Sequence, residues 1–238
     1  MKFTRFQILL LATTLVSGLF VSNAHPQTVD EIFQNFKNAF EKSENFSANF
    51  EETTLVSNRK SVARGRFIFG KPNLLRKEYV HQKDASKIVQ TTVLDGTHAW
   101  TYTPILNQVN KIKWNKSGRK ELIPGTGASL QDVQANYDMV IVPDEFANPK
   151  GIYQIALTPK KDPKDPMMRT NVKEKMLIWV KSGEWFPVQF GYESELEDGT
   201  RQSAIVALTD IQRDIEIAPD LFKFVVPKDA EVIDLSEN

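Results

Sequence analysis

Short segments in which apolar and polar residues alternate fill the chain from Asn45 onward, and they constrain its fold more than any other feature. A period of two is typical of β-strands with one buried face, and turn residues such as Asp95-Gly96 separate the segments. The segments lie at residues 47–56, 61–69, 74–80, 87–94, 98–103, 109–114, 137–142, 151–159, 174–181, 186–195 and 201–212. They predict an antiparallel arrangement of about eleven strands.

Two helices are predicted beside these strands. Thr28 can cap a helix over residues 29–43, and a shorter helix is predicted over residues 128–135. So many strands form a curved sheet whose concave face needs an apolar cover. We therefore expect a mainly β fold, an incomplete and unclosed antiparallel barrel covered by helices and enclosing a hydrophobic cavity. The aromatic stripe of the first helix, Phe33, Phe36 and Phe40, is then either ordinary core packing or the lid of that cavity.

The first 24 residues have the pattern of a secretory signal peptide. Lys2 and Arg5 precede an apolar stretch, and small residues lead up to Ala24, where we expect cleavage. A membrane anchor is the rival interpretation, but polar residues and glycine interrupt the stretch, which falls short of the roughly 20 residues of a bilayer span. The chain has no cysteine, so it offers neither a disulfide nor a site for an acyl anchor. We expect one soluble, exported domain over residues 25–238.

Charge and motifs exclude several classes of function. Removing Lys2 and Arg5 leaves 28 basic against 30 acidic residues, a balance that gives no footprint for nucleic acid. His25, His81 and His98 show no spacing typical of metal binding or of a nucleophile's partner. The segment 125–129 contains glycine but lacks the lysine of a phosphate loop, so it predicts a turn and helix cap. We expect no enzyme activity, cofactor or metal, although catalytic carboxylates leave weak traces in a sequence.

Large apolar side chains are the feature that remains: the chain has 15 Phe, 4 Trp and 5 Met. On a curved sheet covered by a helix, such side chains would line a pocket for lipid. The candidate lipid-binding residues are Phe33, Phe36, Phe40, Phe67, Phe69, Leu75, Tyr79, Trp100, Tyr102 and Trp179.

Several stretches resemble the LolA-like family, the periplasmic carriers of outer-membrane lipoproteins. NFSANFEET, RGRFIFGKPNLLRKEY, VLDGTHAWTYTPILNQV, GTGASL, IYQIALTPK and DLFKFVVPKDAEVID occur in the family's order over nearly all of the chain after the leader. The resemblance implies an unclosed barrel with an apolar cavity. It also implies a periplasmic carrier that receives acylated lipoproteins from an inner-membrane ABC exporter and passes them to an outer-membrane receptor. We expect a monomer.

The family commonly has an arginine before Pro-Asn that holds the empty cavity shut, and here that residue is Lys71. Lysine can bond a carbonyl but lacks the planar fork of arginine. Lys71 is thus a weaker lid latch, or Arg76, Arg66 or no residue has that role. Leu74 and Leu75 should face opposite sides of the sheet, and the resemblance implies that Leu75 lies at the rim where partners dock.

Other interpretations stay open. The pocket could hold another lipid or glycolipid, or the fold could serve as a sensor of lipid or stress. The loop 160–168 looks longer than the family's usual connection, and it places Met167 and Met168 either at the cavity mouth or on the plain surface.

Overall fold

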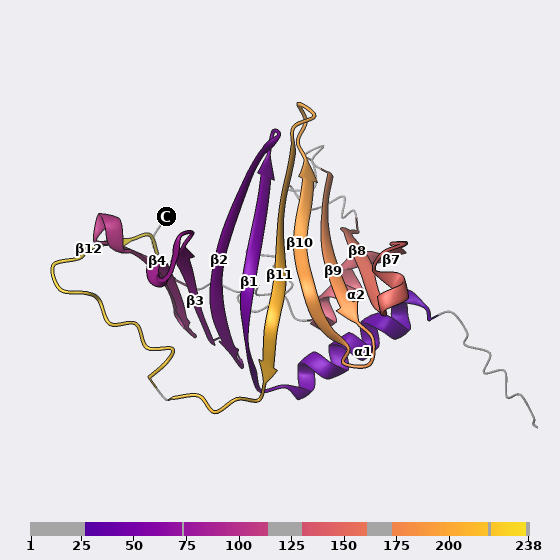
Figure 1. Ribbon diagram of the computed structural model, residues 1–238, viewed down its shortest axis with the longest axis horizontal. Coiled ribbons are helices and arrows are strands. Elements are labelled where there is room, and N and C mark those ends of the chain that lie inside the picture. The colour runs from indigo at the N-terminus through magenta and orange to yellow at the C-terminus, as the bar shows by residue number, and fades with distance from the viewer. Residues whose placement is uncertain (1–26, 73, 114–129, 161–172, 219, 237–238) are drawn as a thin grey trace, which may run out of the picture.

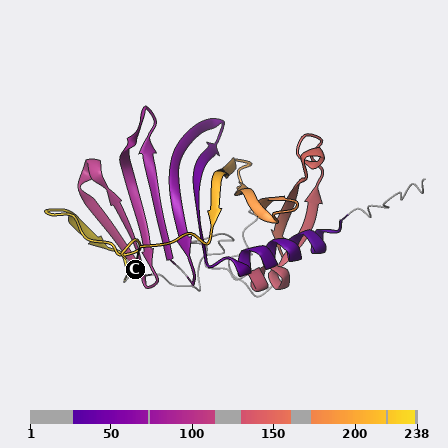
Figure 2. The same cartoon turned by 60° about the horizontal axis from the view of Figure 1, so that its bottom comes forward.

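The computed structural model describes residues 27–72, 74–113, 130–160, 173–218 and 220–236. Within them the chain forms one strongly curved sheet with α1 against one of its faces (Figures 1 and 2). The strands are β1 (Asn45–Val56), β2 (Arg59–Gly70), β3 (Leu74–His81), β4 (Asp84–Asp95), β5 (His98–Thr103), β6 (Gln108–Lys113), β7 (Tyr137–Val142), β8 (Ile152–Pro159), β9 (Lys173–Lys181), β10 (Phe186–Glu195), β11 (Arg201–Arg213) and β12 (Glu231–Asp234). The helices are α1 (Val29–Lys42) and α2 (Leu130–Asn136), with short 3-10 turns η1 (Pro104–Leu106) and η2 (Asn148–Lys150).

The sheet is unclosed and almost entirely antiparallel. Its order is β12-β6-β5-β4-β3-β2-β1-β11-β10-β9-β8-β7, so β12 and β7 are the two edges. The predicted mainly β fold, an incomplete and unclosed antiparallel barrel, is confirmed, and the sheet has twelve strands in place of about eleven. The additional strand, β12, is short and pairs in parallel with β6. The predicted enclosed cavity stays a prediction.

Helix α1 begins and ends close to the predicted limits. Thr28 Oγ1 accepts a hydrogen bond from the backbone N–H of Glu31 at 3.2 Å, and Glu31 Oε2 accepts one from the N–H of Thr28 at 2.8 Å. This capping box satisfies two backbone donors that have no partner inside the helix, and a cap of this kind contributes about 1 kcal/mol. The apolar stripe then faces the sheet, where Ile32, Phe33 and Phe36 are fully buried. The burial of each contributes about 1.5–3 kcal/mol.

Strand register divides the side chains between two faces. The inner face packs against α1, and the outer face is the opposite one. Phe46 of β1 lies opposite Phe69 of β2, which lies opposite Leu75 of β3, so these three side chains share the inner face. The residues next to them along each strand point outward because successive side chains alternate.

The C-terminal segment packs on the outer face. Phe222 lies beside Gly70, where an added Cβ would come within 3.2 Å of its ring, and Phe224 stacks on Trp100 with ring centroids 5.5 Å apart. The segment is attached at both ends. Near β11, the side chain of Asn45 donates to the carbonyl of Ile215 and accepts from its N–H, and β12 then adds to β6. The outer face thus has its own apolar cover, separate from α1.

Several predicted features lie outside the described residues. These are the leader 1–24, His25, the segment 125–129, and Met167 and Met168 in the loop after Lys160. Of the helices that the structure does describe, none has the length and apolar character to cross a membrane.

Candidate ligand-binding face

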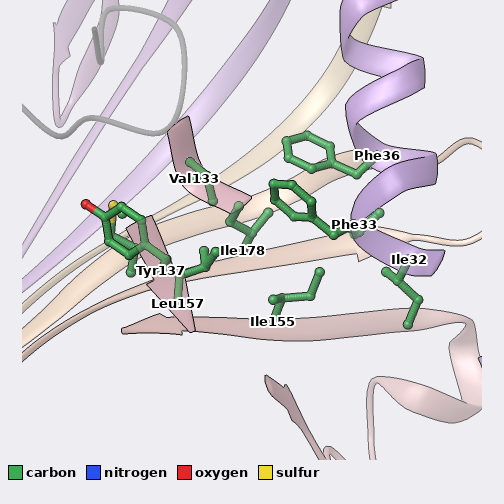
Figure 3. Close-up of a cluster of buried hydrophobic side chains, with 10 residues drawn as sticks. Ile32, Phe33, Phe36, Val133, Tyr137, Ile155, Leu157 and Ile178 are labelled. Atoms are coloured by element: carbon green, nitrogen blue, oxygen red, sulfur yellow. The ribbon is translucent and has the colours of Figure 1, made fainter. Parts of the chain in front are cut away.

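A first apolar cluster joins α1 to the β7–β10 half of the sheet (Figure 3). Phe33 and Phe36 pack edge to face, with ring centroids 5.8 Å apart. They lie over Ile155 of β8 and Ile178 of β9, which are also fully buried. This half of the inner face is therefore ordinary packed core. Of the two roles that the sequence left open for the aromatic stripe, Phe33 and Phe36 have that of core packing.

A second apolar cluster lies on β1, β2, β10 and β11, and Phe40 connects it to α1. The cluster contains Phe46, Ala48, Phe50, Phe67, Phe69, Phe186, Val206 and Leu208. Phe40 is only partly buried, yet its ring centroid lies 5.9 Å from those of Phe46 and Phe69 and 6.0 Å from that of Phe186. Because Phe40 sits near the end of α1, it is the part of the helix that covers the middle of the sheet.

An apolar row continues from this cluster across the next strands. The register aligns Phe46, Phe69, Leu75, Leu94, Ala99 and Ile112 on β1 to β6. Strands lie about 4.8 Å apart, so the five steps of this row span about 24 Å. Leu75, Ala99 and Ile112 are half-buried, whereas Leu94 and the two phenylalanines are buried. The row is a continuous apolar track comparable in length with a long acyl chain.

A polar row runs beside the apolar row on the same face. It comprises Lys77, Thr92, Thr101 and Asn110 on β3 to β6, aligned in register. At its β3 end, Glu52 Oε2 on β1 accepts hydrogen bonds from Lys77 Nζ at 3.0 Å and from Tyr79 Oη at 2.8 Å. Burial and the negative charge of Glu52 raise the pKa of Tyr79 well above its ordinary value, so this hydroxyl stays protonated at neutral pH.

A groove of about 480 Å³ opens at the far ends of β2 to β4, beyond the polar row. It is lined by Val62, Ala63, Tyr79, Val80, His81, Gln82, Lys83, Val89 and Gln90. Tyr79 belongs both to the groove and to the contacts with Glu52, so the two features adjoin. The groove thus adjoins the Glu52 contacts of the inner face at Tyr79.

The structure brings together seven of the ten residues predicted to bind lipid and separates three. Phe33, Phe36, Phe40, Phe67, Phe69, Leu75 and Tyr79 belong to the clusters of the inner face or pack against them. The expectation that Trp100, Tyr102 and Trp179 share that face is wrong. Trp100 and Tyr102 lie in register with Val93 and Thr91 on the outer face, and Trp179 alternates with the inward Ile178. Trp100 donates its indole N–H to Asp95 Oδ2 at 2.8 Å.

Lys71 contacts the end of α1, as a latch would. Its Nζ donates to the backbone carbonyl of Glu41 in the last turn of the helix and lies 3.6 Å from the Glu44 carboxylate. Its backbone N–H donates to the carbonyl of Glu44 at 3.0 Å. The strand after Lys71-Pro72, which are joined by a cis peptide bond, starts with Leu74 outward and Leu75 inward.

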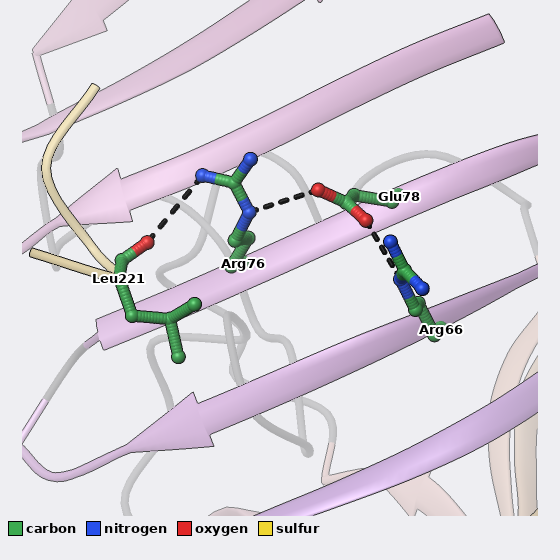
Figure 4. Close-up of polar contacts among 4 residues, drawn as sticks. All are labelled: Arg66, Arg76, Glu78 and Leu221. Carbon is green, nitrogen blue, oxygen red and sulfur yellow. Dashed lines mark hydrogen bonds and ion pairs between the residues drawn. The ribbon is translucent and has the colours of Figure 1, made fainter. Parts of the chain in front are cut away.

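Arg76 is not placed to hold α1, which corrects the prediction that named it as an alternative latch. Its guanidinium is on the outer face, donating from Nε to Glu78 Oε1 at 2.9 Å and from Nη1 to the carbonyl of Leu221 (Figure 4). Arg66 donates from Nε to Glu78 Oε2 at 2.8 Å on that same face, so it too is directed away from α1. Burial would raise the pKa of Glu78, but the hydrogen bonds and charges of the two arginines outweigh it and lower that pKa.

The two histidines among the described residues, His81 and His98, lie far apart along the sheet. His81 Nδ1 accepts a hydrogen bond from the N–H of Lys83, and His98 packs beside Trp100 while its Nδ1 contacts Thr97 Oγ1 at 2.9 Å. In the part of the chain that the structure describes, no three His, Asp or Glu side chains gather where they could hold a metal ion.

Two charged residues of the inner face, Glu52 and Lys77, are not among the residues predicted to bind lipid. The signal was present in LLRKEY, because a period of two places Lys77 on the same face as Leu75 and Tyr79.

The sequence is similar to those of several known proteins over most of its length. The chain is 25% identical over 229 residues to an outer-membrane lipoprotein carrier protein of Neisseria meningitidis, and the match covers 96% of both chains. It is 26% identical over 234 residues to that of Actinobacillus pleuropneumoniae, covering 94% of this chain and 92% of that one. The chain is thus similar in sequence to outer-membrane lipoprotein carrier proteins over most of its length. The carrier of Alkalilimnicola ehrlichii is 28% identical over 170 residues, covering 71% and 67% of the two chains. No family model matches the chain.

Solved structures of similar proteins were also found. An uncharacterised conserved protein of Thermus thermophilus has a TM-score of 0.49 and 14% identity, covering 87% of this chain and 99% of that one. A LolA superfamily protein of Nitrosomonas europaea has a TM-score of 0.41 and 14% identity, covering 84% and 99%.

Proposed function

We propose that this protein is a carrier of acylated proteins, shielding the acyl chains of lipoproteins on the inner face of its sheet. The observation that carries the proposal is the apolar row of β1 to β6, which continues the aromatic cluster beneath the end of α1. The names of the curated relatives, outer-membrane lipoprotein carrier proteins, support the same role.

The energetic need for such a carrier follows from the hydrophobic effect. Each methylene buried away from water contributes about 0.8 kcal/mol, so a chain of about fifteen carbons left in water costs on the order of 12 kcal/mol. A protein that carries a lipoprotein through water must supply equivalent apolar surface and must also release the chain. Binding and release require no covalent chemistry, in line with a role other than that of an enzyme.

The route of transport extends the proposal. The leader directs the chain to the periplasm, where the domain over residues 25–238 acts as a soluble monomer. It receives lipoproteins from an inner-membrane ABC exporter and delivers them to an outer-membrane receptor. The names of the relatives, outer-membrane lipoprotein carrier proteins, support the carrier role in this proposal.

The end of α1 is the movable cover of the binding face. Phe40 is half-buried over Phe46 and Phe69, and Lys71 donates to the carbonyl of Glu41 one residue later. The fully buried Ile32, Phe33 and Phe36 hold the first half of the helix to the sheet. An acyl chain that enters the apolar row displaces Phe40 while the start of α1 stays in place.

A charge in the apolar row tests this function. Leu75→Glu places a carboxylate on the half-buried part of the row, where an acyl chain could bind only by removing water from the charge at a cost in free energy. Ile105→Glu is the control, because Ile105 is 88% exposed. The measurement is capture of a lipoprotein from detergent by the purified protein, with circular dichroism to confirm folding. We expect Leu75→Glu to abolish capture and Ile105→Glu to retain it. Equal capture by both variants, or none by the unaltered protein, would reject the proposal.

The nature of the cargo is decided by a second experiment. Native mass spectrometry of the protein isolated gently from its source separates an acylated polypeptide from a free lipid or glycolipid by mass. The proposal predicts a polypeptide-bearing cargo, and a free lipid would favour a carrier of another lipid or a lipid sensor.

A further inference from the structure

The row of polar side chains on the inner face has a composition that acyl-chain shielding alone does not require. Lys77, Thr92, Thr101 and Asn110 lie side by side in register, one step from the apolar row Leu75, Leu94, Ala99 and Ile112. An inner face that only shielded hydrocarbon would be apolar in both rows. The face is instead amphipathic, with the two rows parallel across four strands.

Lys77 stands at the boundary between the aromatic and the polar parts of this face. Phe67 is its neighbour on β2, and Thr92 is its neighbour on β4. Its Nζ lies 4.6 Å from the ring centroids of both Phe50 and Tyr79, and its side chain is 25% exposed. The ammonium is thus held in place by cation–π contacts and remains within reach of a molecule on the inner face.

The hydrogen-bonding capacity of Lys77 is not used up by its ion pair. An ammonium has three donors, and the bond to Glu52 Oε2 employs one of them. Tyr79 Oη donates to that same carboxylate oxygen. The two cation–π contacts fix the ammonium without supplying acceptors, so it can donate to an oxygen that arrives with a ligand.

A charged pair in this position also has an energetic cost. Removing a lysine and a glutamate partly from water costs desolvation energy, and an apolar pair of similar volume is often as stable or more stable. The side chains of Glu51 and Arg64 form a comparable pair on the outer face, where they are 47% and 59% exposed. The inner pair is less exposed, at 22% for Glu52 and 25% for Lys77, so its position calls for a function.

We propose that the Lys77 row is a subsite for the carbonyl oxygens that join acyl chains to the head of the ligand. Lys77 donates a hydrogen bond to an ester or carboxylate oxygen. The hydroxyl groups of Thr92 and Thr101 are hydrogen-bonded to each other at 3.3 Å, so this pair has one further O–H donor for a ligand oxygen along the row. The hydrocarbon then lies on the apolar row, and the head leaves toward the groove at the ends of β2 to β4. This inference rests on the proposed function, because it specifies which part of an acylated ligand each row receives.

The test compares ligands that share a chain but differ in oxygen atoms. Palmitate, methyl palmitate and hexadecane each displace a fluorescent acyl probe from the unaltered protein, from Lys77→Met and from Lys77→Arg. Arg64→Met is the matched control, because it removes the cation of the Glu51 pair on the outer face. Urea unfolding of each variant checks that the fold is retained.

We expect Lys77→Met to lower the affinity for palmitate and for methyl palmitate by about tenfold or more, because it removes a hydrogen bond from a charged donor. The affinity for hexadecane should not change in Lys77→Met. Lys77→Arg should bind the two oxygen-bearing ligands almost as tightly as the unaltered protein, and Arg64→Met should bind all three ligands as the unaltered protein does. A larger loss for palmitate than for its ester would assign the subsite to a free carboxylate, and an equal loss would assign it to a neutral carbonyl.

Two results would overturn the inference while leaving the proposed function intact. One is an equal loss of affinity for hexadecane and for methyl palmitate in Lys77→Met, which would indicate that Lys77 only supports the structure of the face. The other is no loss of either oxygen-bearing ligand. If none of the three molecules binds the unaltered protein, both the carrier function and this subsite fail together.

Discussion

Replacement of Phe40 by alanine is the perturbation that best separates core packing from a cover over a binding face. The ring of Phe40 contacts those of Phe36, Phe46, Phe69 and Phe186, with centroids 5.9–6.0 Å away. A fully buried Phe→Ala change costs about 3–5 kcal/mol, and each aromatic pair adds about 0.5–1.5 kcal/mol. Because Phe40 is only partly buried, we expect the free energy of unfolding to fall by about 2–3 kcal/mol.

The same variant should take up ligand faster, because Phe40 no longer competes for the space over Phe46 and Phe69. Urea unfolding measures the stability, and stopped-flow fluorescence of an acyl probe measures the association rate. A melting temperature lower by about 4–12 °C would accompany the loss of stability. Phe146→Ala is the control, since Phe146 is 82% exposed, and it should change neither quantity. A stability loss below about 0.5 kcal/mol, or unchanged association, would refute the assignment of Phe40 as a cover.

Two further predictions concern polar contacts. Lys71→Met removes the hydrogen bond to the Glu41 carbonyl, so the association rate of an acyl probe should rise. The free energy of unfolding should fall by about 1 kcal/mol at most. An unchanged association rate would show that Lys71 is not a latch. Glu78→Gln leaves two guanidinium groups beside a neutral amide and should cost about 2–3 kcal/mol at neutral pH. Because the folded pKa of Glu78 lies below its ordinary value of 4.5, its contribution is complete above that pH and is lost as the pH falls further. The stability difference between Glu78→Gln and the unaltered protein should therefore shrink in acid, and a constant difference from neutral to acid pH would contradict this assignment.

The fold was largely predictable because its local signals agree with one another. The alternation of the segments, the turn at Asp95-Gly96 and the cap at Thr28 each depend on neighbouring residues alone. Residues 229–234 read as a short extended segment, but β12 was not counted among the predicted strands because it pairs in parallel with β6, a contact between residues more than a hundred positions apart. This pairing depends on where the C-terminal segment runs, which no local pattern specifies.

The binding face was predicted only in part, because the face of a side chain depends on register. Both faces of β5 are half-buried, so the alternation in HAWTYT does not say whether Trp100 or Ala99 points inward. Trp100 points outward because Phe224 of the C-terminal segment covers it there. Large aromatic side chains were assigned to the pocket by size, whereas the sheet has two apolar faces, each with its own cover.

Paramagnetic NMR tests the central claim most directly, namely that acyl chains lie on the inner face. The ligand is a fatty acid with a nitroxide on its chain, and the observed signals are the methyl groups of Leu75 and Leu94, which face inward, and of Val93 and Val109, which face outward. Leu75 and Leu94 should lose more intensity than Val93 and Val109 when the ligand binds, because broadening by a nitroxide falls steeply with distance. Loss of intensity at Val93 and Val109 with Leu75 and Leu94 unaffected would contradict the account.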